Sequence, residues 1–368
     1  MKKIKVMTVF GTRPEAIKMA PLVKELQSRK EIECIVCVTA QHREMLDQVL
    51  ETFDITPNYD LNIMKKGQTL GEITTRALQG LEQVIKEIKP DIVLVHGDTT
   101  TTFAGALAAF YNQVDIGHVE AGLRTYDKYS PYPEEMNRQM VTCMADMYFA
   151  PTKLSASNLI KEGREKNKIY ITGNTAIDAM KTTIVDNYKN EVLNWVGNSK
   201  MILLTAHRRE NLGNPMRNIF KAVKRILDEF DDVKVVYPIH LNPKVREVAN
   251  EIFSECDRIK LIEPLEVFDF HNFQNKSYII LSDSGGIQEE APSLGKPVLV
   301  LRDTTERPEG IEAGTLKLVG TDEYKIYSET KKLLIDEDAY NKMSKASNPY
   351  GDGNASKKIV EAIIKKYK

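Results

Sequence analysis

The sequence predicts an α/β protein of two αβα domains, each with a parallel β-sheet covered by helices on both faces. Short apolar runs that are typical of buried strands alternate with helical patterns along the chain. Seven of these runs end in a polar or charged cluster, and 368 residues are enough for two such domains. Because open α/β sheets bind ligands at the carboxyl ends of their strands, these clusters predict an enzyme site in a cleft between the domains.

The strands and helices are expected in two series. The seven strands cover residues 6–10, 34–39, 92–95, 114–117, 201–205, 233–237 and 278–281, with two more at 148–150 and 169–171. Apolar residues recur at helical spacing over residues 16–26, 103–111, 219–227 and 355–367. Residues 181–200 are a weakly patterned connection, and a new series begins at Met201. We therefore expect domains over residues 1–172 and 173–354, with a last helix within 355–368 that can pack on either.

Composition and charge exclude several classes of function. The net charge is -1, so no overall field attracts nucleic acid or an anionic membrane. No apolar run is long enough to span a bilayer, and the start of the chain leads into a strand without a signal peptide pattern. We expect a cytoplasmic protein with no nucleic acid or membrane partner.

The sequence carries no motif for a metal or a redox cofactor. Cys34 and Cys37 form a C-x-x-C inside an expected strand, where residues three apart point to opposite faces, so we interpret them as core residues. The chain has no H-E-x-x-H, no G-x-S-x-G, no Walker loop and no nicotinamide-binding fingerprint. We predict no metal, no disulfide and no cofactor.

Two strand-to-helix turns could hold phosphate. In the first, Thr12 can cap a helix, and Arg13 adds a charge beside the helix N-terminus. In the second, Ser284, Gly285 and Gly286 let the backbone approach a diphosphate, and Glu290 lies about one helical turn further on, where it could accept ribose hydroxyls. The alternative is structural: a capped turn with a surface Arg, and a glycine-rich αβ turn.

Acid–base groups follow the expected strands. Asp98 and Glu120 come after two strands of the first half, and Glu134 and Arg138 share one face of a helix. Carboxylates held close together acquire different pKa values, which suits one of them for proton transfer. His207 ends a strand of the second half. Taken singly, Asp98 could be a helix cap, the Glu134–Arg138 pair a surface ion pair, and His207 a structural residue.

Nine segments in order along nearly the whole chain carry a resemblance to a known family. They are GTRPEAIKMAPL (11–22), QHR (41–43), VHGDT (95–99), HVEAGLR (118–124), PEEMNR (133–138), HRREN (207–211), PIHLNP (238–243), DSGGIQEE (283–290) and TERPE (305–309). Together they resemble the non-hydrolysing UDP-N-acetylglucosamine (UDP-GlcNAc) 2-epimerases.

The resemblance implies a GT-B-like architecture of two Rossmann-like domains, the second binding UDP, with the final helix crossing back to the first. It also implies a homodimer without a cofactor that reversibly converts UDP-GlcNAc to UDP-N-acetylmannosamine (UDP-ManNAc) for cell-surface polysaccharide. By resemblance, the residues that act in catalysis are Asp98, Glu120, Glu134 and His207. Those that bind substrate are Arg13, Lys18, Arg138, His240, Phe270, Ser284, Gly285, Gly286, Glu290 and Arg307, with Phe270 near the uracil.

The family can also carry a regulatory site for a second UDP-GlcNAc. Gln41, His42 and Arg208, with His240 beside them, match its positions. Glu44 and Gly67 differ from the Gln and Arg that regulated members tend to have, so allosteric activation stays open.

The chemistry of the resemblance suits the residues present. The C2 proton of UDP-GlcNAc is not acidic, so the implied route expels UDP from C1, removes the C2 proton to give 2-acetamidoglucal, and adds UDP back. Three alternatives remain: a hydrolysing epimerase that releases N-acetylmannosamine and UDP, a GT-B glycosyltransferase, and a UDP-sugar sensor that binds without turnover. Neither the pathway that uses the product nor the carboxylate that takes the C2 proton is predicted.

Overall fold

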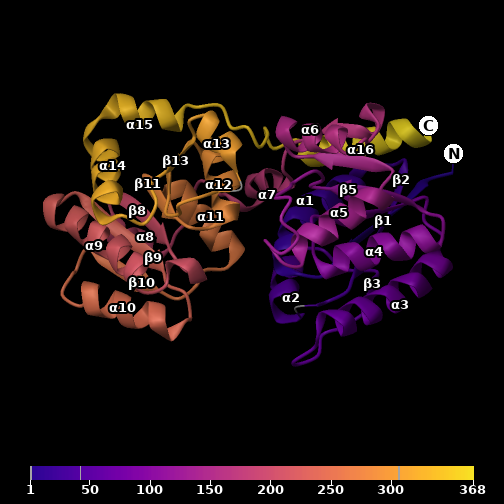
Figure 1. The fold of residues 1–368 in the computed structure, drawn as a ribbon, viewed down its shortest axis with the longest axis horizontal. Helices are drawn as coiled ribbons and strands as arrows, with labels where there is room; N and C mark the ends of the chain where they lie inside the picture. Colours follow the sequence, from indigo (N-terminus) through magenta and orange to yellow (C-terminus); the bar gives the residue numbers. More distant parts are fainter. Residues whose placement is uncertain (1, 42, 306) are drawn as a thin grey trace. The chain divides into compact units, whose positions relative to one another are not determined.

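The structure is a computed structural model that describes residues 2–41, 43–305 and 307–368, apart from the side chain of Arg209. The chain forms two compact units (Figure 1). Unit 1 comprises Met1–Lys181 and Tyr350–Lys368, and unit 2 comprises Thr182–Pro349. The end of the chain thus returns to the unit in which the chain begins. The sequence-based boundary after residue 172 falls between the last strand of unit 1 and helix α7 (Thr175–Thr183).

Unit 1, as far as it is described, contains a seven-stranded sheet in the order β3-β2-β1-β4-β5-β6-β7. Neighbouring strands pair in parallel, with Val6 of β1 opposite Cys34 of β2 and Ile92 of β4. The order reverses between β1 and β4, which makes this edge the expected binding position of a doubly wound sheet. The strands are β1 (Ile4–Phe10), β2 (Ile32–Val38), β3 (Tyr59–Asp60), β4 (Ile92–His96), β5 (Asp115–Val119), β6 (Met147–Ala150) and β7 (Ile169–Ile171).

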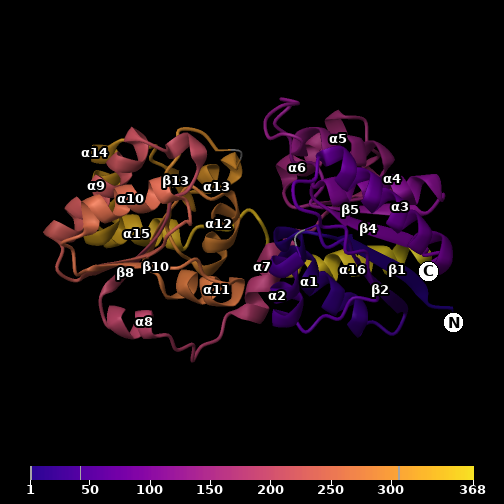
Figure 2. The same cartoon turned by 90° about the horizontal axis from the view of Figure 1, so that it is seen from below.

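Helices cover both faces of this sheet (Figure 2). One face carries α1 (Arg13–Ser28), α2 (Arg43–Thr52) and α16 (Ala355–Tyr367). The other carries α3 (Leu70–Ile88), α4 (Thr100–Tyr111), α5 (Glu134–Met144) and α6 (Lys153–Lys161). Helix α16 packs on α1. Its N-terminus is capped by Asp178, whose carboxylate accepts hydrogen bonds from the backbone N–H of Ala355 (3.1 Å) and Ser356 (2.6 Å).

Unit 2 contains, among its described residues, a six-stranded parallel sheet in the order β10-β9-β8-β11-β12-β13. The strands are β8 (Lys200–Thr205), β9 (Val233–Pro238), β10 (Ile259–Ile262), β11 (Ile279–Ser282), β12 (Val298–Val300) and β13 (Leu316–Leu318). One face packs against α9 (Asn214–Glu229), α10 (Pro243–Phe253) and α14 (Glu323–Ile335). The other packs against α8 (Glu191–Val196), α11 (Val267–Lys276), α12 (Gly285–Glu290) and α13 (Pro308–Glu312), and α15 (Glu337–Ser344) follows α14.

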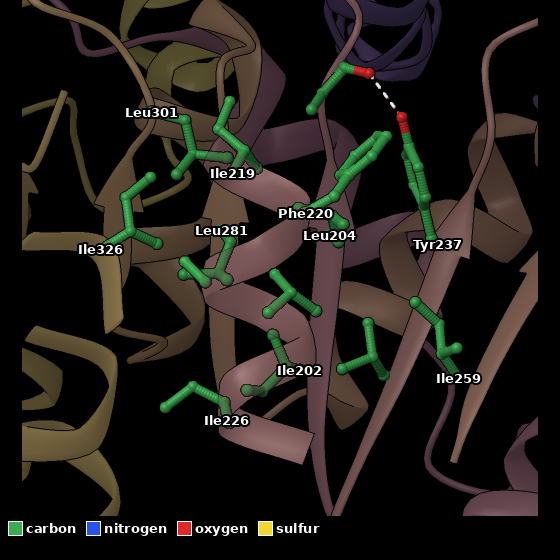
Figure 3. Close-up of a cluster of buried hydrophobic side chains, with 14 of the residues drawn as sticks. Ile202, Leu204, Ile219, Phe220, Ile226, Tyr237, Ile259, Leu281, Leu301 and Ile326 are labelled. Atoms are coloured by element: carbon green, nitrogen blue, oxygen red, sulfur yellow. Dashed lines mark hydrogen bonds between the residues drawn. The ribbon is translucent and has the colours of Figure 1, made fainter. Parts of the chain in front are cut away.

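The core of unit 2 shows why these residues form these elements (Figure 3). Ile219, Phe220 and Ile226 lie on one face of α9 at helical spacing, and all three are buried. They pack against alternate residues of the central strands, among them Ile202 and Leu204 of β8. Because β8 is buried on both faces, its sequence is almost continuously apolar.

The structure confirms the predicted fold class, two α/β units with parallel sheets. All nine predicted strands are present, with bounds close to those expected. The strands β3, β10, β12 and β13 were not predicted, since each has only two to four residues and little pattern of its own. Among the described helices, none is long and apolar enough to cross a membrane.

Candidate active site

Three carboxylates gather at the carboxyl edge of the sheet in unit 1. Asp98 lies two residues beyond β4, and Glu120 directly follows β5, the neighbouring strand. Glu134 is the first residue of α5, and its charge acts on Asp98, as does that of Glu120. The backbone of Glu120 has a φ of 63°, in the left-handed region that non-glycine residues rarely adopt and that is common at functional sites. The structure therefore brings together the three carboxylates that the sequence singled out.

Asp98 is held by α5 through both its side chain and its backbone. Arg138 places Nη2 2.7 Å from Oδ2 of Asp98, and Nη1 3.5 Å from Oε2 of Glu135. The side-chain amide of Asn137 donates to the carbonyl O of Asp98 at 2.9 Å. The Arg138 side chain is only 11% exposed, so the alternative interpretation of Arg138 as one half of a surface ion pair is wrong.

Burial raises the pKa of Asp98 to about 6. The charges of Glu120 and Glu134 act in the same direction as burial, whereas the Arg138 guanidinium and the Lys18 ammonium oppose it. The pKa of about 6 is the net result. The carboxyl of Asp98 is thereby poised to exchange a proton near neutral pH, as a general acid or base requires.

Glu120 has a different environment from Asp98. Its carboxylate forms an ion pair with Lys18 of α1 and accepts a hydrogen bond from the side-chain amide of Asn174 at 3.3 Å. Nε2 of His96 lies 3.7 Å from the same carboxylate oxygen. Burial lowers the pKa of His96 to about 4, so this imidazole is neutral at physiological pH.

Glu15 supports the candidate site and was not predicted from the sequence. It completes a capping box with Thr12 at the start of α1, accepting from the backbone N–H of Gly11 (3.1 Å) and of Thr12 (2.8 Å). Its other oxygen accepts from the hydroxyls of Thr99 (2.7 Å) and Thr102 (3.1 Å) at the start of α4. Burial raises the pKa of Glu15, and these donors oppose that rise.

Through these bonds Glu15 ties the turn that carries Arg13 to the turn that carries Asp98. Arg13 is the first residue of α1 and is partly exposed. A signal for this role was present in the T-x-x-E spacing of a capping box, but the partners on α4 come from a distant part of the chain.

Glu135 is the second residue that was missed. Its side chain is fully buried and accepts from the backbone N–H of Thr125 and of Tyr126, each at 3.0 Å, and from the side-chain amide of Gln139 at 2.7 Å. Glu135 therefore fixes the loop before α5, and with it the position of its neighbour Glu134.

The residues matched to a regulatory site lie partly within unit 1. Gln41 follows β2, and its side-chain oxygen accepts from the hydroxyl of Thr101 at 3.2 Å. The hydroxyl of Thr101 in turn forms a hydrogen bond with the hydroxyl of Thr39 at 2.9 Å. The Thr39 hydroxyl lies against Gly11, so that a Cβ added to Gly11 would be 1.9 Å from its oxygen. His42 lies outside the described residues.

In unit 2, His207 lies two residues beyond β8 on a turn held by Asp283. The buried Asp283 carboxylate accepts from the backbone N–H of His207 (2.8 Å) and of Arg208 (2.9 Å), and from the side-chain amide of Asn211 (3.0 Å). Burial lowers the pKa of His207, and the Asp283 charge opposes this. The ring of His240, which follows β9, lies parallel to that of His207 within 10°, with centroids 5.6 Å apart.

The glycine-rich turn after β11 begins α12, as predicted. Ser284 precedes the helix, and Gly285 and Gly286 are its first two residues. A Cβ on Gly285 would lie 2.8 Å from Nη1 of Arg307, so a larger residue at this position would have to displace the guanidinium. Arg307 also donates through Nε to the buried Glu289 at 2.7 Å. The sequence analysis did not foresee Glu289 as the partner that orients Arg307.

Glu290 ends α12, and Phe270 lies on α11 of the same unit. The Glu290 carboxylate accepts from the side-chain amide of Gln274 on α11 at 3.0 Å and lies 3.9 Å from Nε2 of His271. Phe270, also on α11, is partly buried and packs against the core on that face of the sheet. Among the described residues, no group of three or more His, Cys, Asp or Glu side chains is arranged to hold a metal ion.

Comparison with known proteins identifies relatives along the full chain. The family model described as UDP-N-acetylglucosamine 2-epimerase matches residues 24–364. A UDP-N-acetylglucosamine 2-epimerase from Bacillus subtilis (strain 168) is 68% identical over 367 residues, which are 100% of this chain and 97% of that protein.

Solved structures agree with this comparison. The S. aureus MnaA–UDP co-structure has a TM-score of 0.91 and 63% identity, covering 100% of this chain and 97% of that one. The UDP-GlcNAc 2-epimerase from Neisseria meningitidis, solved bound to UDP-GlcNAc, has a TM-score of 0.88 and 52% identity, covering 98% of this chain and 100% of that one. Because the family model and these relatives span nearly all of the sequence, the chain belongs to the UDP-N-acetylglucosamine 2-epimerase family.

Proposed function

We infer that this protein is an isomerase that interconverts UDP-GlcNAc and UDP-ManNAc by inverting the configuration at C2 of the sugar. The observation that carries this inference is the cluster of carboxylate side chains in unit 1. In it, Asp98 and Glu120 occupy one sheet edge in different electrostatic environments. Family membership supports it, since relatives of high identity bear the name of this enzyme. A sensor would have no use for clustered acid–base groups.

The reaction proceeds by elimination and addition. The bond between C1 and the UDP oxygen breaks, and the C2 proton is lost to a protein base, which gives 2-acetamidoglucal and UDP. UDP then returns to C1 while a proton is delivered to the opposite face of C2. This route needs no redox cofactor, but it needs acid–base groups at the ring and positive charge at the departing diphosphate.

Asp98, Glu120, Glu134 and His207 are the proposed catalytic residues. Asp98 exchanges a proton readily near neutral pH, because burial raises its pKa to about 6. Glu120, paired with Lys18, is placed to stabilise positive charge that develops on the ring. Arg138 supports the role of Asp98, because it binds this carboxylate directly.

The UDP portion is assigned to a separate group of residues, most of them in unit 2. Solved relatives bound to UDP and to UDP-GlcNAc support a UDP-binding site in this chain, and the residues are assigned from the sequence. The backbone at Gly285 and Gly286 can approach a diphosphate closely, and Arg307 lies beside it. The full set proposed for UDP is Arg13, Phe270, Ser284, Gly285, Gly286, Glu290 and Arg307, and His240 is proposed to bind the substrate as well.

The homodimer, the cytoplasmic location and the regulatory site remain proposals from the sequence. The regulatory site would use Gln41, His42 and Arg208. A hyperbolic dependence of rate on UDP-ManNAc in the absence of UDP-GlcNAc would exclude activation by that site.

Product analysis tests the proposed function. Purified protein is incubated with UDP-GlcNAc, with no NAD and no metal, and the sugars are followed by proton NMR. We expect UDP-ManNAc to accumulate to a constant ratio that is also reached from UDP-ManNAc. Free N-acetylmannosamine with UDP would assign the protein to the hydrolysing epimerases, and saturable binding without products would favour a sensor.

A further inference from the structure

The turn that carries His207 is fixed by buried side chains on both neighbouring strands. Tyr237 of β9 donates through its hydroxyl to the carbonyl O of Ala206 at 2.6 Å, the bond drawn in Figure 3. Asp283, directly after β11, accepts the backbone N–H of His207 and of Arg208. Since β8 lies between β9 and β11, the turn is held from both sides.

The two carboxylate oxygens of Asp283 have different surroundings. Oδ2 accepts three hydrogen bonds, from two backbone N–H groups and from Asn211, whose amide also donates to the carbonyl O of Leu301. Oδ1 is buried, accepts no hydrogen bond from the described residues, and lies 3.4 Å from Nδ1 of the His207 imidazole. A buried carboxylate oxygen without a donor is costly, and a proton on Nδ1 of His207 is the donor placed to satisfy it.

We propose that Asp283 is a positioning residue that keeps the His207 proton on Nδ1 and presents Nε2 as the reactive nitrogen. The hydrogen bond at one ring nitrogen decides which tautomer a histidine adopts. The two atoms are 3.4 Å apart, and such bonds commonly tighten when substrate binds. The proposal rests on the proposed function, in which His207 acts on the bound UDP-sugar.

The other groups that face His207 fit this assignment. Nδ1 of His240 accepts the backbone N–H of Asn242 at 3.1 Å, so neutral His240 carries its proton on Nε2. The parallel rings of His207 and His240 thus hold opposite tautomers. Burial and the neighbouring His240 and Arg208 lower the pKa of His207, which keeps the imidazole neutral and able to exchange a proton at Nε2.

Asp283→Asn separates the two tasks of this side chain. The amide oxygen can replace Oδ2 as acceptor for the turn, and the amide nitrogen then replaces Oδ1 and donates to Nδ1 of His207. The variant should keep its fold but reverse the tautomer of His207. Tyr237→Phe is the matched control, because it removes the other support of the turn without touching the imidazole.

The direct test is ¹⁵N–¹H NMR of histidine-labelled full-length protein at pH 8, with the His207 signals assigned by their loss in His207→Gln. We expect His207 to be protonated on Nδ1 in the wild type and in Tyr237→Phe, and on Nε2 in Asp283→Asn, with His240 on Nε2 throughout. A wild-type His207 protonated on Nε2, or no change in Asp283→Asn, would overturn the proposal. This result does not depend on which reaction the protein catalyses.

Kinetics test the consequence for catalysis. We expect kcat of Asp283→Asn to fall about 100-fold or more, as when acid–base catalysis is lost, while KM changes little. In the pH–rate profile of Asp283→Asn, the limb due to His207 should move to lower pH, because the Asp283 carboxylate no longer raises the pKa of the imidazole. In a His207→Gln background, Asp283→Asn should cause no further loss of kcat. A reversed tautomer with unchanged kcat would show that Asp283 does not position His207 for the reaction.

Discussion

Asp98 and Glu120 are carboxylates of one sheet edge whose surroundings give them different tasks. Burial, together with the charges of two other carboxylates, raises the pKa of Asp98 to about 6 against the opposing charge of the Arg138 guanidinium. Glu120 forms an ion pair with Lys18 and accepts a hydrogen bond from the side-chain amide of Asn174, and both interactions favour the charged form of a carboxyl group. Two neighbouring carboxyl groups with different environments are a common solution to acid–base chemistry at neutral pH.

The pH dependence of the rate should follow Asp98. The carboxyl gains its charge only as the pH rises through about 6, because burial raises its pKa to that value. If the ionised form acts in the free enzyme, kcat/KM falls about tenfold per pH unit below this value. We expect this acid limb in the wild type and its loss in the weakly active Asp98→Asn. An unchanged limb in that variant would show that another group titrates there.

Loss of the Glu120 charge should reduce turnover strongly. We expect Glu120→Gln to lower kcat by about 100- to 10,000-fold, the range over which single acid–base or electrostatic groups act. Glu82→Gln is the matched control, since Glu82 forms an exposed ion pair with Lys86 on α3 and should leave kcat unchanged. Steady-state assays of both variants give the comparison, and similar rates for Glu120→Gln and the wild type would contradict the assignment.

Sequence reasoning predicted the residues that follow strands but not those that support them. Asp98 and Glu120 were predictable because parallel strands end at a common edge. Glu15 and Glu135 were not, because their roles depend on donors that folding brings to them: the hydroxyls of α4 for Glu15 and the loop before α5 for Glu135. Asp283 stood in a recognised motif, yet only the structure shows that it faces His207.

At the scale of elements, two helices of unit 1 begin with the same capping box in different settings. Thr12 and Glu15 start α1, and Thr69 and Glu72 start α3. Among the described residues, exposed Glu72 bonds Thr69 at its own helix start, whereas Glu15 is buried and also binds the start of α4. The same sequence pattern is therefore a local cap in one place and a tie between two active-site turns in the other.

Substitution of these two glutamates should separate the local cap from the tie. We expect Glu15→Ala to lower the free energy of unfolding by roughly 3 kcal/mol or more, because buried backbone and hydroxyl donors lose their acceptor. Glu72→Ala should have a much smaller effect, since water can replace an exposed cap. Urea unfolding followed by circular dichroism measures both. Equal effects would mean that the bonds from Glu15 to α4 add nothing to stability.

The strands that the sequence did not reveal share a physical cause. β12 and β13 have three residues each and β3 has two, so local pattern gives little evidence for them, although β7, also of three residues, was predicted. Each pairs in parallel with a neighbour that was predicted or with another short strand at the sheet edge. Their existence depends on tertiary pairing and not on local preference.

At the scale of the whole molecule, each unit has its own hydrophobic core, which is why the fold class was predictable from two separate series of strands. Unit 1 is nevertheless built from both ends of the chain. Helix α16 buries Ile359, Val360 and Ile363, and Asp178 caps its first turn. The apolar pattern of this helix predicted its existence, but not the unit on which it packs.

Asp178→Ala should destabilise unit 1 alone. Loss of a helix cap typically lowers the free energy of unfolding by about 1–2 kcal/mol, and Asp178 caps α16, which packs on α1 of unit 1. Trp195, the chain's single tryptophan, lies in unit 2 between Lys234 and Lys260, so its fluorescence reports unit 2. We expect the circular dichroism transition to broaden toward lower urea while the fluorescence midpoint stays constant. An equal shift of both would show that the two units unfold as one.

The central claim is that the proton at C2 is removed and returned. The most direct measurement is proton NMR of the full-length protein with UDP-GlcNAc in deuterated water, without NAD or metal, beside Glu120→Gln. We expect UDP-ManNAc with deuterium at C2 to form with the wild type and to be nearly absent with the variant. UDP-ManNAc that retains its original C2 proton would contradict proton removal to a base that exchanges with solvent.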